Sequence, residues 1–119
     1  LGHPWPDFPQ QPLYMKRIDS LRAQLNGPRD GALLRYSLGT ALLDAGDTTE
    51  AITHLRAATG FDEGYSAAWK QLGHACQRAG DTPAALEAWR RGIAAAETRG
   101  DVQAAKEMRV FLKRLEAGH

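Results

Sequence analysis

The chain lacks several features that mark particular classes of protein. Its 119 residues contain a single cysteine, Cys76, so an internal disulfide framework is excluded and a reducing, cytoplasmic compartment is expected. No apolar run approaches the length of a membrane span, and none resembles a secretory signal. Lysine and arginine number 15 against 14 aspartate and glutamate residues. This near-zero charge predicts neither a nucleic-acid footprint nor a membrane-surface helix.

Residues that could support catalysis or hold a metal ion are also scarce. The four histidines, His3, His54, His74 and His119, stand apart from one another and from any cluster with metal-ligand spacing. Cys76 falls on the side of its helix that is expected to be buried, which favours an inert core thiol. No glycine-rich phosphate loop is present. The sequence therefore predicts no enzyme activity, no cofactor and no metal site.

What the chain does contain is typical of a small all-helical domain. Alanine and leucine dominate, strand-favouring residues are sparse, and a hydrophobic share of 43% is enough for one core. Residues 1–12 hold four of the six prolines and predict an extended leader. Met15 is a possible natural start, which would make the leader an expression remnant. One interpretation is that the leader is disordered. The other has Trp5 and Phe8 docking on an apolar surface.

The remaining residues divide into helical segments separated by glycine, proline and aspartate. Asp30 is expected to cap the second helix and Thr82 the fifth. Val102, Ala105 and Met108 are expected to face inwards from the last helix. The predicted parts are a flanking helix at 13–26, a first helical pair at about 30–63, a second pair at about 64–99, and a capping helix at 101–117.

The two helical pairs repeat each other with a period of 34 residues. Leu38-Gly39 corresponds to Leu72-Gly73, Ala45-Gly46-Asp47-Thr48 to residues 79–82, and Ala51-Ile52 to residues 85–86. This period and the motif Trp-x2-Leu-Gly resemble the tetratricopeptide repeat family. The resemblance implies an all-α solenoid of antiparallel helical hairpins. It also implies that the domain is a protein-interaction scaffold.

The recurring residues serve packing, which leaves the variable positions free for binding. Trp69 and Trp89 are interpreted as structural anchors, and small residues stand where two helices approach closely. In this family the first helices of the repeats normally line a concave groove. The mixture of side chains expected there suits a short peptide with a carboxylate near apolar anchors. The predicted groove residues are Tyr36, Thr40, Leu43, Lys70, His74, Gln77, Arg78 and Met108, and Ala104 and Phe111 could extend the groove.

Two other functions stay open at this point. The domain could chiefly self-associate, as a homodimer or as a tether for a larger chain. RNA binding would instead use the basic face of the last helix, formed by Lys106, Arg109, Lys113 and Arg114, and the near-neutral charge argues against it. The expected partner is therefore a protein or peptide whose identity the residues do not reveal, or a second copy of the chain.

Overall fold

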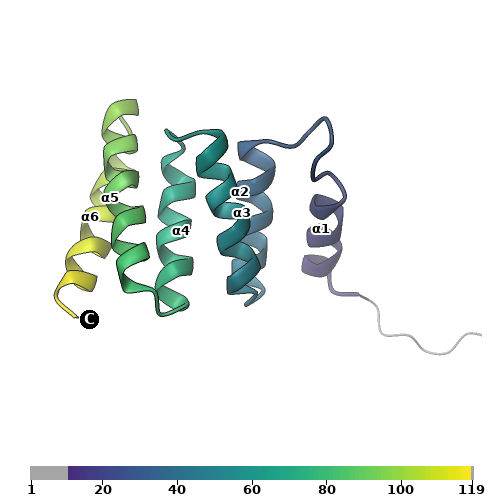
Figure 1. Cartoon of the computed structure of the whole chain (residues 1–119), viewed down its shortest axis with the longest axis horizontal. Helices are drawn as coiled ribbons and strands as arrows, with labels where there is room; N and C mark the ends of the chain where they lie inside the picture. Colours follow the sequence, from purple (N-terminus) through teal and green to yellow (C-terminus); the bar gives the residue numbers. More distant parts are fainter. Residues whose placement is uncertain (1–10, 119) are drawn as a thin grey trace, which may run out of the picture.

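The computed structural model describes residues 11–118, which form six α-helices and no strand (Figure 1). The all-α prediction is confirmed. Residues 1–10 of the predicted leader lie outside the described part of the chain. The predicted docking of Trp5 and Phe8 falls on these residues. The helices are α1 (Leu13–Arg22), α2 (Ala32–Asp44), α3 (Thr48–Phe61), α4 (Ser66–Arg78), α5 (Thr82–Arg99) and α6 (Val102–Glu116).

The helices stack in chain order as antiparallel hairpins. The connections from α2 to α3 and from α4 to α5 are only a few residues long, so each pair must fold back on itself. Helix α4 also packs against α3 of the preceding pair, and α6 packs against α5. Figure 1 shows this row of helices, with α1 at the purple end and α6 at the yellow end. This is the predicted solenoid arrangement.

Aspartate side chains start three of the helices. Asp47, Asp81 and Asp101 accept hydrogen bonds from backbone N–H groups in the first turns of α3, α5 and α6, at 3.3, 3.1 and 3.1 Å. The prediction that Thr82 caps α5 is therefore wrong by one residue, since Asp81 provides the side-chain acceptor. At the other end of α5, Gly100 has a φ of 76°, the left-handed conformation that glycine adopts most readily.

Asp30 does not cap α2 as predicted, because Gly31 occupies the N-cap position. The Asp30 carboxylate instead accepts hydrogen bonds from Nε and Nη2 of Arg35, both at 2.8 Å, and from the backbone of Asn26. The bonds from Arg35 hold the pKa of Asp30 far below its usual range. Asp30 thus closes the turn between α1 and α2. Helix α1 ends at Arg22, four residues before its predicted end.

A chain of polar contacts attaches α1 to the first hairpin. Arg22 of α1 donates to both carboxylate oxygens of Glu50 on α3, at 2.6 and 3.0 Å. The Glu50 carboxylate in turn lies 3.4 Å from Nε2 of the buried His54. Arg35 can only donate, so Nδ1 of His54 accepts from it at 3.3 Å and the ring proton lies on Nε2. Together with the buried side chain of Ile18, these contacts position α1.

Close helix packing explains the repeated small residues. A Cβ atom on Gly39 would lie 2.6 Å from Cγ of Leu55, and one on Gly73 would overlap the indole of Trp89. Trp69 and Trp89 are buried, in agreement with the prediction that they are structural anchors. In each repeat, therefore, a glycine on the first helix leaves space for a large side chain of the second helix.

The capping helix differs from the prediction at one position. Ala105 and Met108 are buried as expected, but Val102 is 63% exposed. Val102 is the first residue of α6, directly after the Asp101 cap, and the buried residues of α6 begin only at Ala104. The first turn of α6 therefore precedes the part of the helix that packs against α5.

Candidate functional site

Two of the predicted groove residues meet on α2 beside a hollow. Tyr36 is half-buried, and its ring centroid lies 5.0 Å from that of Tyr65 at the start of α4. Burial raises the pKa of Tyr65. The Oγ1 atom of Thr40 is buried, and no residue within 11–118 offers it a hydrogen bond. The hollow has a volume of about 300 Å³ and is lined by Tyr14, Arg17, Tyr36, Ser37, Thr40, Ala41 and Asp44.

His74 lies in an aromatic cluster between α4, α5 and α6. Its ring contacts Phe111 at 4.7 Å and Trp89 at 5.4 Å, in edge-to-face geometry. Burial, followed by the nearby charges of Lys70 and Arg78, lowers the pKa of His74. The imidazole is consequently neutral at pH 7, available for hydrogen bonding but not as a cation. Phe111, which was predicted to extend the groove, is half-buried and packs against this ring.

The two other cations predicted for the groove already have partners inside the protein. Nζ of Lys70 forms an ion pair with Glu107 of α6 at 3.5 Å. Nη1 of Arg78 donates to the backbone oxygen of Leu43, near the end of α2, at 3.1 Å. Gln77 is exposed. This end of the groove therefore carries less uncompensated positive charge than the sequence predicted.

Five of the predicted residues stand at equivalent or neighbouring positions of α2 and α4, because the 34-residue repeat places Tyr36 and Thr40 where Lys70 and His74 stand. Tyr36 reaches from α2 to the start of α4, while Lys70 and His74 reach from α4 to α6. Gln77 falls on the same side of α4, because it follows His74 by three residues. We call this surface the inner face and define it by Tyr36, Thr40, Lys70, His74 and Gln77.

Leu43 and Met108 do not belong to this surface, and their prediction as groove residues is wrong. Leu43 is 2% exposed and Met108 is 0% exposed. Leu43 is buried because α2 packs against α4 as well as α3. The two neighbours together cover more of the α2 surface than α3 would cover alone. Met108 is buried because its Sδ atom lies against Gly92 of α5. Ala104, the expected extension of the groove, is also buried.

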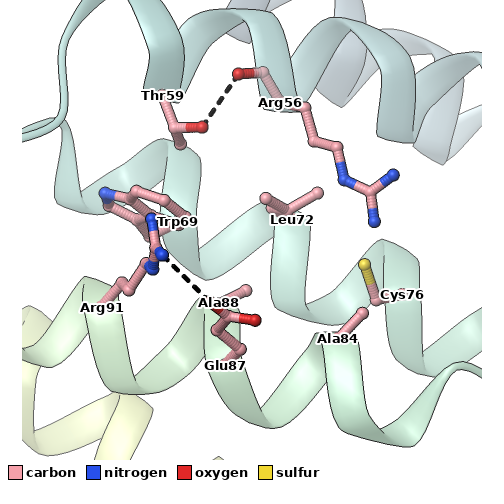
Figure 2. Close-up of a pocket in the computed structure, with 9 residues that line it drawn as sticks. All are labelled: Arg56, Thr59, Trp69, Leu72, Cys76, Ala84, Glu87, Ala88 and Arg91. Carbon is pink, nitrogen blue, oxygen red and sulfur yellow. Dashed lines mark hydrogen bonds and ion pairs between the residues drawn. The ribbon is translucent and has the colours of Figure 1, made fainter.

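The structure contains a second hollow that the sequence did not predict. It lies between α3 and α5, with α4 as its floor, and has a volume of about 240 Å³ (Figure 2). We call it the outer pocket. A sequence signal for it exists in Ala84 and Ala88, which leave space on the side of α5 that faces α3. The outer pocket is lined by Arg56, Thr59, Trp69, Leu72, Cys76, Ala84, Glu87, Ala88 and Arg91.

Within residues 11–118, no three or more histidine, cysteine or acidic side chains are placed to hold a metal ion. Burial raises the pKa of Cys76, which favours the unreactive thiol over the thiolate. Among the described helices, none combines the length and the apolar character needed to cross a membrane.

Comparison with known proteins identifies the repeat. A sequence model described as tetratricopeptide repeat matches residues 42–108, more than half of the chain. The chain belongs to the tetratricopeptide repeat family. Repeats of this family generally mediate protein–protein interaction and are generally not catalytic.

Relatives of this tetratricopeptide repeat domain occur among bacterial proteins. A TPR repeat-containing protein of Pseudomonas aeruginosa is 50% identical over 99 residues, which cover 83% of this chain and 94% of that protein. The solution structure of a Bordetella parapertussis protein is 42% identical, with a TM-score of 0.73, and the match covers 91% of this chain and 90% of that one. A crystal structure of MamA is similar in fold, with a TM-score of 0.66 at 22% identity, over 90% of this chain and 72% of that one.

Proposed function

We propose that this domain binds a short peptide segment of a partner protein along its inner face. The observation that carries the proposal is the hollow of about 300 Å³ beside α2, which both Tyr36 and Thr40 line. A buried hydroxyl without a partner costs about 1–3 kcal/mol, which a ligand recovers when it supplies a hydrogen bond. Thr40 is in that state within the described residues. A peptide group that reaches Thr40 from the hollow would supply the missing hydrogen bond.

The chemistry of the inner face indicates what kind of peptide it accepts. Tyr36 offers an aromatic surface for an apolar side chain, and Thr40, His74 and Gln77 offer hydrogen bonds to a peptide backbone. Lys70 is already paired with Glu107, so an acidic residue in the ligand would have to compete for it. We therefore propose an extended segment with one apolar anchor, in which a carboxylate contributes little to the affinity.

A selection from a phage-displayed random peptide library tests this function directly. Peptides selected on the full chain are measured by calorimetry against the wild type, Tyr36→Ala and Thr40→Val. Valine keeps the shape of threonine and removes only its hydroxyl, so a ligand that bonds Thr40 loses affinity without a change in packing. A loss of about 1 kcal/mol, or roughly fivefold in Kd, is expected for Thr40→Val.

The control for this experiment is Lys113→Ala, an exposed position on α6 away from the inner face. Its affinity for the selected peptides should match that of the wild type. The assignment to the inner face fails if Tyr36→Ala and Thr40→Val remain folded by circular dichroism and bind every selected peptide as tightly as the wild type.

Self-association is a second candidate function, favoured by the apolar surface of α1. Leu13 is 82% exposed and Tyr14 54%, and Met15 next to them is also exposed. Exposed apolar residues in a cluster often mark a protein interface. Sedimentation equilibrium of the wild type and of Leu13→Glu distinguishes the two functions. A dimer that Leu13→Glu dissociates would support self-association, whereas a monomer at every concentration would exclude it.

A further inference from the structure

The outer pocket faces away from the inner face, although α4 contributes to both surfaces. Trp69, Leu72 and Cys76 of α4 form the floor of the outer pocket. Lys70 and His74 follow Trp69 by one and five residues, which places them about 100–140° further round the helix. A ligand in one site therefore does not touch the other, and the two can be tested separately.

The size of the outer pocket suits one large apolar side chain. Its volume is about 240 Å³, whereas a cavity of about 150 Å³ holds benzene. Drug-sized ligands and cofactors occupy roughly 300–1,000 Å³, so the outer pocket alone is too small for them. Leu72 of the floor and Ala84 and Ala88 of the α5 wall provide an apolar lining. A leucine or phenylalanine side chain of a partner would match this space.

The rim of the outer pocket carries one positive charge without a counter-ion. Arg91 forms an ion pair with Glu87 at 3.0 Å and lies over the Trp69 ring, 5.6 Å from its centroid. Arg56 of α3 is exposed and forms no ion pair with any residue between 11 and 118. Figure 2 shows its guanidinium extending from α3 towards Cys76. A carboxylate next to the apolar anchor would complete this rim, because arginine binds carboxylates in a bidentate fork.

The surface continues beyond the outer pocket along α5. A neighbouring hollow shares Trp69 and Arg91 with it and is also lined by Ala94, Ala95 and Thr98. From Ala84 to Thr98 this path follows α5 over 15 residues, or about 21 Å. That length accommodates a peptide segment of several residues and exceeds what a single small molecule would cover.

We propose that the outer pocket is a second protein-binding site, which takes a partner segment with a large apolar residue beside an aspartate or glutamate. The apolar residue occupies the space between Leu72 and Ala88, and its neighbouring carboxylate pairs with Arg56. This site works independently of the inner face, so a partner could occupy both surfaces at once.

The test begins with phage-displayed random peptides selected on the full-length wild-type chain. Bound peptides are then measured by calorimetry against Arg56→Glu, which reverses the rim charge, and Ala84→Leu, which fills the space. We expect a class of peptides with an apolar residue within four positions of an acidic one. For this class, either substitution should raise Kd by about tenfold or more. Exchanging the peptide's acidic residue for lysine should restore binding to Arg56→Glu.

The controls separate this site from the inner face and from effects on folding. Lys113→Glu, an exposed charge reversal on α6, should leave Kd unchanged, and so should Thr40→Val. Arg56 is exposed, so Arg56→Glu should keep the wild-type melting temperature and the test stands even if Ala84→Leu unfolds the domain.

Several results would overturn the proposal of a second site. One is a selection that returns no peptide of the expected class. Another is a class whose affinity is unaffected by Arg56→Glu, or which loses affinity with Thr40→Val and so binds the inner face. A wild-type dimer that Arg56→Glu dissociates would show that a second copy of the chain, and not a partner peptide, covers the outer pocket.

Discussion

The contact between Gly73 of α4 and Trp89 of α5 allows a direct test of how the repeat packs. In Gly73→Ala the new Cβ atom would overlap Nε1, Cδ1 and Cε2 of the indole. Trp89 is 1% exposed and cannot move aside into solvent. Its Nε1 also donates to the backbone oxygen of Lys70 at 3.2 Å, and a displaced ring would lose this bond. The substitution should therefore disrupt the hairpin while adding only one methyl group.

The expected loss of stability follows from three terms. Overpacking a core costs about 1–3 kcal/mol, and a lost hydrogen bond costs about 1 kcal/mol. Replacing glycine by alanine within a helix recovers roughly 0.5–1 kcal/mol. We therefore expect Gly73→Ala to lower the free energy of unfolding by about 1–3 kcal/mol and Tm by about 4–12 °C. Urea and thermal unfolding followed by far-UV circular dichroism measure both quantities.

Two other glycines provide matched controls for this prediction. Gly39→Ala is the same change in the first repeat, but its Cβ would meet the flexible side chain of Leu55 at 2.6 Å, so the loss should be smaller. Gly60→Ala lies in α3 with no atom near its Cβ and should increase stability by roughly 0.5–1 kcal/mol. The packing argument is refuted if Gly73→Ala is as stable as the wild type, or less harmful than Gly39→Ala.

Three further predictions concern charges and the thiol. The pKa of Asp30 is depressed in the folded state, so the stability that it contributes is present above about pH 4 and declines as the pH falls further. Asp30→Asn should accordingly lower Tm at pH 7 by more than at pH 2, and equal differences would exclude the pair with Arg35 as the cause. Arg22→Ala removes the bonds to Glu50, so hydrogen exchange should quicken in α1 and stay unchanged in α4. Because Cys76 is buried, it should react slowly with a thiol reagent until urea unfolds the chain. A native-state reaction as fast as that of an exposed cysteine would contradict this prediction.

Much of the fold could be predicted because its signals are local. The 34-residue period, the aspartates before α3 and α5, and the glycines after α2 and α4 all lie within a few residues of the structure that they specify. The exposure of Val102 was mispredicted, because a helical period cannot show where the neighbouring helix begins to cover α6. The capping role of Asp30 was mispredicted for a similar reason, since Arg35 and Asn26 compete for its carboxylate.

The candidate site was less predictable, because its properties depend on contacts between helices. The sequence predicted Lys70 and Arg78 to be free cations. In the structure Lys70 forms an ion pair with Glu107, and Arg78 donates a hydrogen bond to the Leu43 carbonyl. Both partners lie about 35 residues away, further than any local pattern extends. The burial of His74 by Phe111 has the same origin.

By itself, the sequence determined the kind of molecule that forms. Its repeated small and large residues allow only close-packed helical hairpins, and its turn residues place the ends of the helices. The tertiary structure alone decided which side chains remain available to a partner. Leu43 and Met108 are removed from the surface by neighbouring helices, and the outer pocket exists only where α3, α4 and α5 meet. The physical reason is that burial and charge pairing are properties of two or more packed elements, whereas helical periodicity is a property of one.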